Sequence, residues 1–251
     1  MAEPRVQLIV PDWPAPPGIV AVSTTRTGGV SDGPYASLNL ATHVGDRATL
    51  VGRNRGRLMQ DLGLAKAPCW LDQVHGNHVV VAENVTRAVT ADAVMSSEID
   101  VVCAVMTADC LPILLCDRGG THVAAVHGGW RGLASGVITS AVSALTSRDI
   151  AAGDLLAWLG PAIGPAVYEV GEDVHDAVRA AGARTTLTAT VPGRWHLDLY
   201  AFARAGLRAC GVEDIHGGNL CTYSDPQRFF SYRRDGTCGR QATLIWRRST
   251  G

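Results

Sequence analysis

The sequence has little charge and almost no excess of either sign. Its 22 Lys and Arg residues face 23 Asp and Glu residues, which gives a formal net charge of -1, and charged residues make up 18% of the chain. A domain that binds nucleic acid usually presents an excess of basic residues. The balance therefore predicts no nucleic-acid partner.

The chain also lacks a hydrophobic run long enough to cross a membrane. Its most apolar stretch, Val101–Cys116, contains Asp109 and Pro112, and it is shorter than the about 20 residues that a spanning helix requires. The N-terminal segment carries acidic residues and prolines, unlike a secretory signal peptide. We therefore expect no membrane association, and we expect two buried strands around a turn in this stretch.

The chain lacks any recognisable cysteine-spacing motif. The seven cysteines are odd in number and contain no CxxC pair. In a chain without an export signal, this pattern favours reduced thiols in the cytoplasm. Cys221 and Cys238 lie in turn-rich regions, where the sequence assigns them no role.

The length and hydrophobic content indicate one globular body. A chain of 251 residues with 47% hydrophobic residues can bury roughly three quarters of its unfolded surface. No repeat, low-complexity tract or linker divides it, so a single domain over residues 1–251 is predicted. Strand-like and helix-like segments interleave without a regular βαβ rhythm. This favours an α+β fold with mixed sheets and outer helices, such as a layered α/β/β/α sandwich.

Sequence patterns place the elements of this fold. Apolar periodicity predicts helices over 47–62, 131–145, 172–181 and 199–210, the first of them capped by Asp46. Runs of β-branched and apolar residues predict strands at 6–10, 19–24, 78–82, 92–95, 101–106, 113–116, 122–126, 155–159, 229–232 and 243–246.

Three short segments place reactive side chains among glycines or turns at the predicted strand ends. They are Gln73–Gly76 with His75, Thr107–Pro112 with Asp109 and Cys110, and Val126–Gly132 with His127. One thiol and two imidazoles can form the three-ligand set of a zinc centre whose fourth position stays open. The alternative interpretation of Cys110 is a small buried apolar residue on a strand.

A series of motifs runs in order through nearly the whole chain. They are TRTGGVS at 25–31, SLNL at 37–40, HVGD at 43–46, QVHG at 73–76, ADCLP at 108–112, HGGWRG at 127–132, GPAIGP at 160–165, YEVG at 168–171 and FFSYRRDG at 229–236. Together they resemble the bacterial YfiH or laccase-domain family, also called polyphenol oxidase or peptidoglycan-editing-factor proteins. Over 160–168, where that family often has cysteines, this chain has none, so no chemistry is assigned there.

The resemblance implies a fold, a metal and a group of reactions. It implies a four-layer α/β/β/α sandwich, with zinc bound by His75, Cys110 and His127. It also implies purine nucleoside chemistry: phosphorolysis of adenosine, inosine and methylthioadenosine, and deamination of adenosine. Zinc-activated water suits the attack on C6 of adenine. Cu²⁺ could substitute for Zn²⁺, because copper(II) stands above zinc in the affinity order.

The remaining candidate residues are assigned by the chemistry that each side chain offers. Asp109 could act as general acid and base or orient a neighbouring ligand. Arg26 and Arg131, each near a pair of glycines, offer guanidinium forks and backbone amides to phosphate; the alternative for each is a structural carboxylate partner. His43 lines the pocket or only precedes the first helix. Trp130 stacks on a purine base or has a packing role.

Other functions stay open on the same residues. Cys110 could be the nucleophile of a metal-free hydrolase with His127 as its base, and the resemblance also suggests hydrolytic editing of peptidoglycan precursors that carry L-serine. A non-catalytic protein would close a four-ligand zinc site with His43, His78 or His122. A multicopper laccase is disfavoured, because the chain has 8 His and no HxH pair where about ten copper-binding histidines are needed. We expect a purine nucleoside and phosphate as partners, and a monomer or small homo-oligomer.

Overall fold

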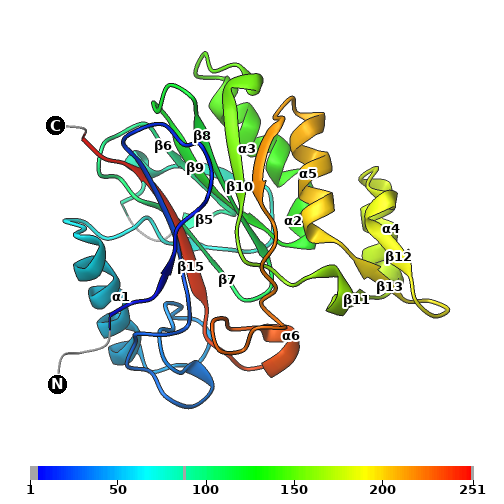
Figure 1. Ribbon diagram of the computed structural model, residues 1–251, viewed down its shortest axis with the longest axis horizontal. Helices are drawn as coiled ribbons and strands as arrows, with labels where there is room; N and C mark the ends of the chain where they lie inside the picture. Colours follow the sequence, from blue (N-terminus) through cyan, green and yellow to red (C-terminus); the bar gives the residue numbers. More distant parts are fainter. Residues whose placement is uncertain (1–4, 87–88, 250–251) are drawn as a thin grey trace.

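Two β-sheets packed face to face form the centre of the computed structural model, which describes residues 5–86 and 89–249 (Figure 1). Apolar side chains from both sheets, among them Val105, Leu114 and Ile245, fill the space between them. The first sheet has the strand order β1 (Leu8–Ile9), β2 (Ile19–Thr24), β15 (Gln241–Arg247) and β7 (Cys103–Thr107). The second has the order β14 (Asp214–Gly217), β10 (Leu155–Leu159), β8 (Leu111–Asp117), β9 (Val123–Gly128), β6 (Ala93–Ser96) and β4 (Val79–Val81).

Helices cover the outer face of each sheet (Figure 1). Helix α1 (Ala48–Leu62) lies on the four-stranded sheet, where Leu58 packs with Val22 and Leu244. Helices α2 (Trp130–Ala134), α3 (Val137–Thr146) and α5 (Leu199–Ala209) lie on the six-stranded sheet, where Ile138 and Leu207 pack against its apolar side chains. The order of layers is therefore helix, sheet, sheet, helix. This confirms the predicted α/β/β/α sandwich with mixed sheets.

Smaller elements surround the sandwich. Helix α4 (Glu172–Ala180) and a three-stranded sheet project to one side in Figure 1; the strands are β11 (Glu169–Val170), β13 (Trp195–Leu197) and β12 (Leu187–Ala189). Strands β3 (Leu71–Asp72) and β5 (Val89–Thr90) form a separate parallel pair. Short 3-10 turns lie at Gly33–Tyr35, Ala82–Asn84, Ala152–Asp154, Pro165–Val167 and Arg184–Thr186.

Three local predictions were wrong. The helix expected over 131–145 is divided into α2 and α3, because the chain passes through Gly136 with a left-handed φ of +87°. Helix α1 starts after Arg47 and has no side-chain cap; Asp46 instead accepts hydrogen bonds from Ser31 and Asn39. The strand expected at 229–232 is absent, and a short helix, α6 (Tyr232–Asp235), begins within that segment.

Strand pairing brings distant segments to one end of the six-stranded sheet. Strands β8 and β9 pair antiparallel with Pro112 opposite His127, so Cys110, the residue before β8, lies beside the end of β9. Strand β6 pairs with β9 on one side and with β4 on the other. The loop before β4, which contains His75, therefore reaches the same end of the sheet.

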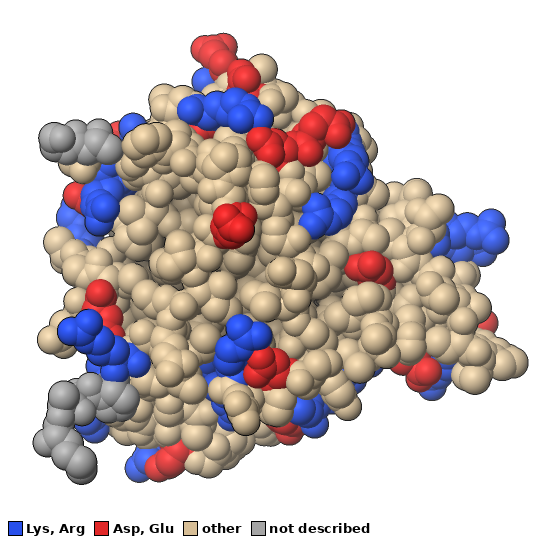
Figure 2. Space-filling model, in the orientation of Figure 1, with Lys and Arg blue, Asp and Glu red and all other residues tan. Residues whose placement is uncertain are grey.

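The surface agrees with the balanced charge of the sequence. On the face shown in Figure 2, acidic and basic side chains lie intermixed and do not form a patch of one sign. Within residues 5–86 and 89–249, no helix combines the length and the apolar character needed to cross a membrane.

Candidate metal centre and pocket

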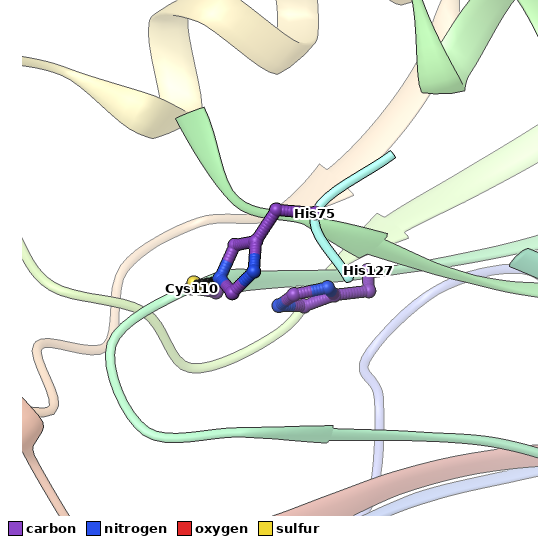
Figure 3. Close-up of side chains that lie close together, drawn as sticks. All are labelled: His75, Cys110 and His127. Atoms are coloured by element: carbon purple, nitrogen blue, oxygen red, sulfur yellow. Dashed lines mark hydrogen bonds between the residues drawn. The ribbon is translucent and has the colours of Figure 1, made fainter. Parts of the chain in front are cut away.

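His75, Cys110 and His127 form a cluster at this end of the sheet (Figure 3). Their potential ligand atoms lie within 4.8 Å of one another. Nε2 of His75 is 3.7 Å from Sγ of Cys110, and the two imidazole rings meet edge to face with centroids 4.8 Å apart. Two imidazoles and one thiol at this spacing can hold a metal ion. Among the described residues the group has these three members, so no fourth histidine closes it.

Gly129 leaves room for this cluster. A Cβ built on Gly129 would lie 2.6 Å from Cδ2 of His75 and 3.1 Å from Sγ of Cys110. Neither distance is compatible with ordinary packing of a methyl group. The close approach of His75 and Cys110 therefore requires glycine at this position.

Asp92 joins the two histidine segments, although it was not predicted as a site residue. Its side chain is fully buried. Oδ1 lies 2.8 Å from Nδ1 of His127, and the two carboxylate oxygens together accept the backbone N–H groups of Val74, His75 and Gly76. A lone acidic residue at the start of an apolar strand was the available signal, because buried carboxylates need partners.

The cluster favours a charged thiol. Burial by itself would raise the pKa of Cys110, but the charge of His127 and hydrogen bonds to both histidines lower it to about 6. For His127 the directions are reversed. Burial by itself would lower the pKa of this imidazole, but the charge of Cys110 and the hydrogen bond to Asp92 raise it to about 9. A thiolate is the form in which cysteine binds metal or attacks an electrophile. The site therefore suits both metal binding and nucleophilic attack by Cys110.

The cluster lies in the wall of a cavity of about 540 Å³. This volume falls in the usual range for a small-molecule site. The wall combines the cluster with aromatic, basic and amide side chains. The other lining residues are His43, Gln73, Met106, Thr107, Ala108, Asp109, Trp130, Arg131, Tyr168, Tyr232, Arg233 and Arg240.

Three guanidinium groups line this cavity, each over an aromatic ring. Arg131 lies 4.3 Å above the ring of Trp130, Arg233 lies 5.0 Å above that of Tyr168, and Arg240 lies 5.8 Å above that of Tyr232. Arg233 and Arg240 donate to backbone carbonyls. Within the described part of the chain, no carboxylate forms an ion pair with any of the three, so the alternative of a carboxylate partner does not hold for Arg131.

Asp109 faces the cavity from beside Cys110, but its carboxylate is already engaged. Oδ1 accepts the Thr222 hydroxyl at 2.6 Å, and Oδ2 accepts the backbone N–H of Arg233 at 2.7 Å. Asp109 is 8% exposed and has a φ of +94°. Through its hydrogen bond to the backbone of Arg233, Asp109 links the loop before β8 to helix α6.

Of the four predicted substrate-binding residues, the structure brings three to the cavity. His43, Trp130 and Arg131 line it. Arg26 does not: its guanidinium donates to the carbonyls of Ala36 and Pro226 and lies 4.6 Å above the ring of Phe230. Both acceptors are backbone oxygens, and among the described residues no carboxylate forms an ion pair with Arg26. Arg233 and Arg240, which are not among these four predicted residues, also line the cavity.

The fold and the cluster define a layered α/β protein with a candidate metal-binding centre at one end of a mixed sheet. Residues 20–248 match the family described as "multi-copper polyphenol oxidoreductase laccase". The chain belongs to this laccase-like family, also known by the name YfiH.

Several relatives match over almost their full length. A purine nucleoside phosphorylase of Pseudomonas aeruginosa is 50% identical over 241 residues, which cover 95% of this chain and 97% of the relative. Purine nucleoside phosphorylase YfiH of Escherichia coli is 49% identical over 242 residues, covering 96% and 98%. A solved structure from Neisseria meningitidis superimposes with a TM-score of 0.90 at 46% identity, covering 96% and 99%. YlmD from Geobacillus stearothermophilus gives a TM-score of 0.85 at 36% identity, covering 93% of each chain.

Proposed function

We propose that this protein is a zinc-dependent purine nucleoside phosphorylase that acts on adenosine, inosine and methylthioadenosine. One observation carries the proposal: the His–Cys–His cluster shares its cavity with three guanidinium groups that have no carboxylate partner among the described residues. Such groups suit a phosphate anion. Relatives named purine nucleoside phosphorylase, about half identical to this chain, support the same reaction.

The donor set fits zinc. Zinc accepts both thiolate sulfur and imidazole nitrogen, and a catalytic zinc site uses three protein ligands. His75, Cys110 and His127 offer these three donors with the wall of an open cavity beside them. Zinc held by these residues would supply a Lewis acid that polarises an oxygen of the bound reactants. Copper could occupy the same donors, but three ligands are far fewer than a multicopper oxidase requires.

The residues of the chain bind and orient the two reactants. Arg131 and Arg233 hold phosphate through paired N–H groups, and the aromatic ring below each guanidinium helps to fix its position. Trp130 and Tyr168 offer ring surfaces to the purine. An oxygen of the bound phosphate then bonds to C1′ as the bond from C1′ to N9 breaks. The purine leaves with the electron pair and takes up the proton that the attacking hydrogen phosphate gives up, so that ribose 1-phosphate and the neutral base are formed. Correct positioning accounts for much of the rate.

Asp109 acts in this proposal by orientation. Because both of its oxygens accept hydrogen bonds within the protein, we assign it the placement of Arg233 and not a proton shuttle. This chooses one of the two roles that the sequence allowed. An Asp109→Asn variant that keeps phosphate affinity but loses turnover would restore the proton-transfer role.

A metal-free cysteine hydrolase is the second candidate. The contacts of His127 favour it, because this imidazole interacts with Cys110 on one side and with Asp92 on the other. A nucleophile, a base and an orienting carboxylate are arranged in this way in cysteine and serine hydrolases. Its substrate would be an amide or ester, such as the peptidoglycan precursors suggested by the family resemblance. Adenosine deamination remains a second reaction of the zinc enzyme, with water in place of phosphate at the same cavity.

Product analysis by mass spectrometry tests the proposal. Zinc-loaded protein receives adenosine and phosphate, with Cys110→Ala as the inactive variant and Cys210→Ala as a matched control outside the cavity. Adenine and ribose 1-phosphate formed by the unmodified and Cys210→Ala proteins alone support phosphorolysis. Inosine and ammonia would indicate deamination. No turnover by any zinc-loaded protein would overturn both, and alkylation-sensitive amide hydrolysis without metal would establish the cysteine hydrolase.

A further inference from the structure

We propose that Asp92 is a positioning residue that sets both histidines of the cluster in their binding orientation before a metal ion arrives. This inference rests on the proposed zinc site and concerns how the chain builds it. Asp92 does not face the cavity itself. It acts through His75 and His127, which come from two different segments.

Both oxygens of the Asp92 carboxylate accept two hydrogen bonds each. Oδ1 accepts from the backbone N of His75 at 2.9 Å and from Nδ1 of His127 at 2.8 Å. Oδ2 accepts from the backbone N of Val74 at 3.2 Å and of Gly76 at 2.7 Å. With four N–H donors around it, the fully buried side chain is a carboxylate without an unsatisfied oxygen.

These contacts fix which nitrogen of His127 faces the cluster. A carboxylate only accepts hydrogen bonds, so Nδ1 of His127 must carry the proton that it donates to Asp92. Its other ring nitrogen, Nε2, is the one left to donate a lone pair to a metal ion, which displaces any proton held there. The backbone N of His127 also donates to the Asp92 carbonyl at 2.7 Å, so ring and backbone are held by the same residue. Histidine ligands in metal sites are commonly oriented by such a carboxylate.

The same carboxylate shapes the loop that carries His75. Consecutive N–H groups at Val74, His75 and Gly76 converge on it, an arrangement that binds anions. His75 has a φ of +61°, a left-handed conformation that a residue with a side chain rarely adopts. The three hydrogen bonds offset the strain and direct the imidazole toward Cys110. In this protein the anion is the carboxylate of Asp92, not an ion taken from solvent.

A matched carboxylate elsewhere allows positioning to be separated from stability. Asp117, at the far end of β8, is also buried and accepts the backbone N–H groups of Thr121 and His122. It has no contact with the cluster. The variants Asp92→Asn and Asp117→Asn both replace a buried acceptor by an amide, and we expect both to lower the thermal midpoint. Only the first should alter metal binding.

Zinc affinity, measured by competition with a chromophoric chelator, is the first readout. Loss of a carboxylate that orients a ligand typically lowers metal affinity 10- to 100-fold, so we expect a loss of about this size for Asp92→Asn and no change for Asp117→Asn. The visible spectrum of the Co²⁺-substituted proteins is the second readout. It reports coordination geometry and should change for Asp92→Asn alone.

Amide hydrogen exchange in the unmodified, metal-free protein keeps the inference testable if Asp92→Asn does not fold. Val74 has an exposed side chain, 60% accessible, so slow exchange at Val74, His75 and Gly76 would come from their bonds to Asp92. Fast exchange at these amides would overturn the inference. Unchanged zinc affinity and an unchanged cobalt spectrum in Asp92→Asn would also overturn it while leaving the zinc site intact. If the unmodified protein binds no zinc, the proposed function and this inference fail together.

Discussion

Gly129→Ala would insert one methyl group between two candidate metal ligands. The added Cβ would lie 2.6 Å from a ring carbon of His75 and 3.1 Å from Sγ of Cys110. Carbon atoms pack best at about 3.5–4.0 Å, so the imidazole must move by roughly 1 Å. The backbone at Gly129 has φ -67° and ψ 154°, an extended conformation open to alanine. The effect is therefore steric.

The size of the effect follows from this displacement. Functional groups in a binding site must be held within about 0.5 Å of their working positions, and the expected shift is about twice that. An inserted methyl group in a packed site typically costs about 1–3 kcal/mol. If this cost falls on the metal-bound state, zinc affinity decreases by about 5- to 150-fold.

A chelator competition titration measures this loss, with Gly52→Ala as the control. Gly52 lies in α1, and a Cβ there would meet no atom within 4 Å. Alanine in a helix interior is favoured over glycine by roughly 0.5–1 kcal/mol, so this variant should raise the thermal midpoint without changing zinc affinity. Zinc affinity of the Gly129→Ala protein equal to that of the unmodified protein would refute the reasoning.

Three further predictions follow from the cavity and the cluster. Arg131→Ala should raise the KM for phosphate by at least about tenfold through loss of a charged hydrogen-bonding group, whereas Arg26→Ala, outside the cavity, should leave that KM unchanged; equal effects would contradict the assignment. In metal-free protein the thiolate of Cys110 forms as the pH rises through about 6, so its rate of alkylation should increase there, and a midpoint near 9 would be inconsistent. Thr107 has a buried hydroxyl with no hydrogen-bond partner among the described residues, so Thr107→Val should leave the free energy of unfolding unchanged or raise it by up to about 1–3 kcal/mol, as denaturant titration would show.

The fold could be predicted well where periodicity was strong. The strands at 19–24 and 155–159 have the bounds expected from their β-branched and apolar runs. The prediction of one helix over 131–145 was wrong because small apolar residues continue the helical pattern on both sides of Gly136. Only the left-handed backbone at Gly136 separates the two helices. The prediction of a strand at 229–232 was wrong because two adjacent apolar residues suggested a buried strand. Phe229 and Phe230 are indeed buried, but they lie in a loop.

The cluster could be predicted because its residues carry distinctive chemistry, whereas their partners could not. Imidazole and thiol groups are recognisable as ligands from their type, and the family motifs select His75, Cys110 and His127. Arg26 and Arg131 both stand near glycine pairs, and the sequence does not show that one faces backbone carbonyls and the other a cavity. Asp92 escaped notice because its role depends on strand pairing between β6 and β9.

The three clustered residues lie far apart along the chain, and this separation would link metal binding at the candidate site to the folding of the protein. His75 precedes Cys110 by 35 positions, and they meet only after β4, β6, β8 and β9 have paired. An unfolded chain does not hold the three donors in one place, so a preformed site exists only in the folded protein. An ion that binds only the folded form stabilises it by about 2.7 kcal/mol at a concentration one hundred times its Kd. If the proposed zinc is the ion bound here, the resistance of this protein to heat and proteolysis should follow the free zinc level in its surroundings.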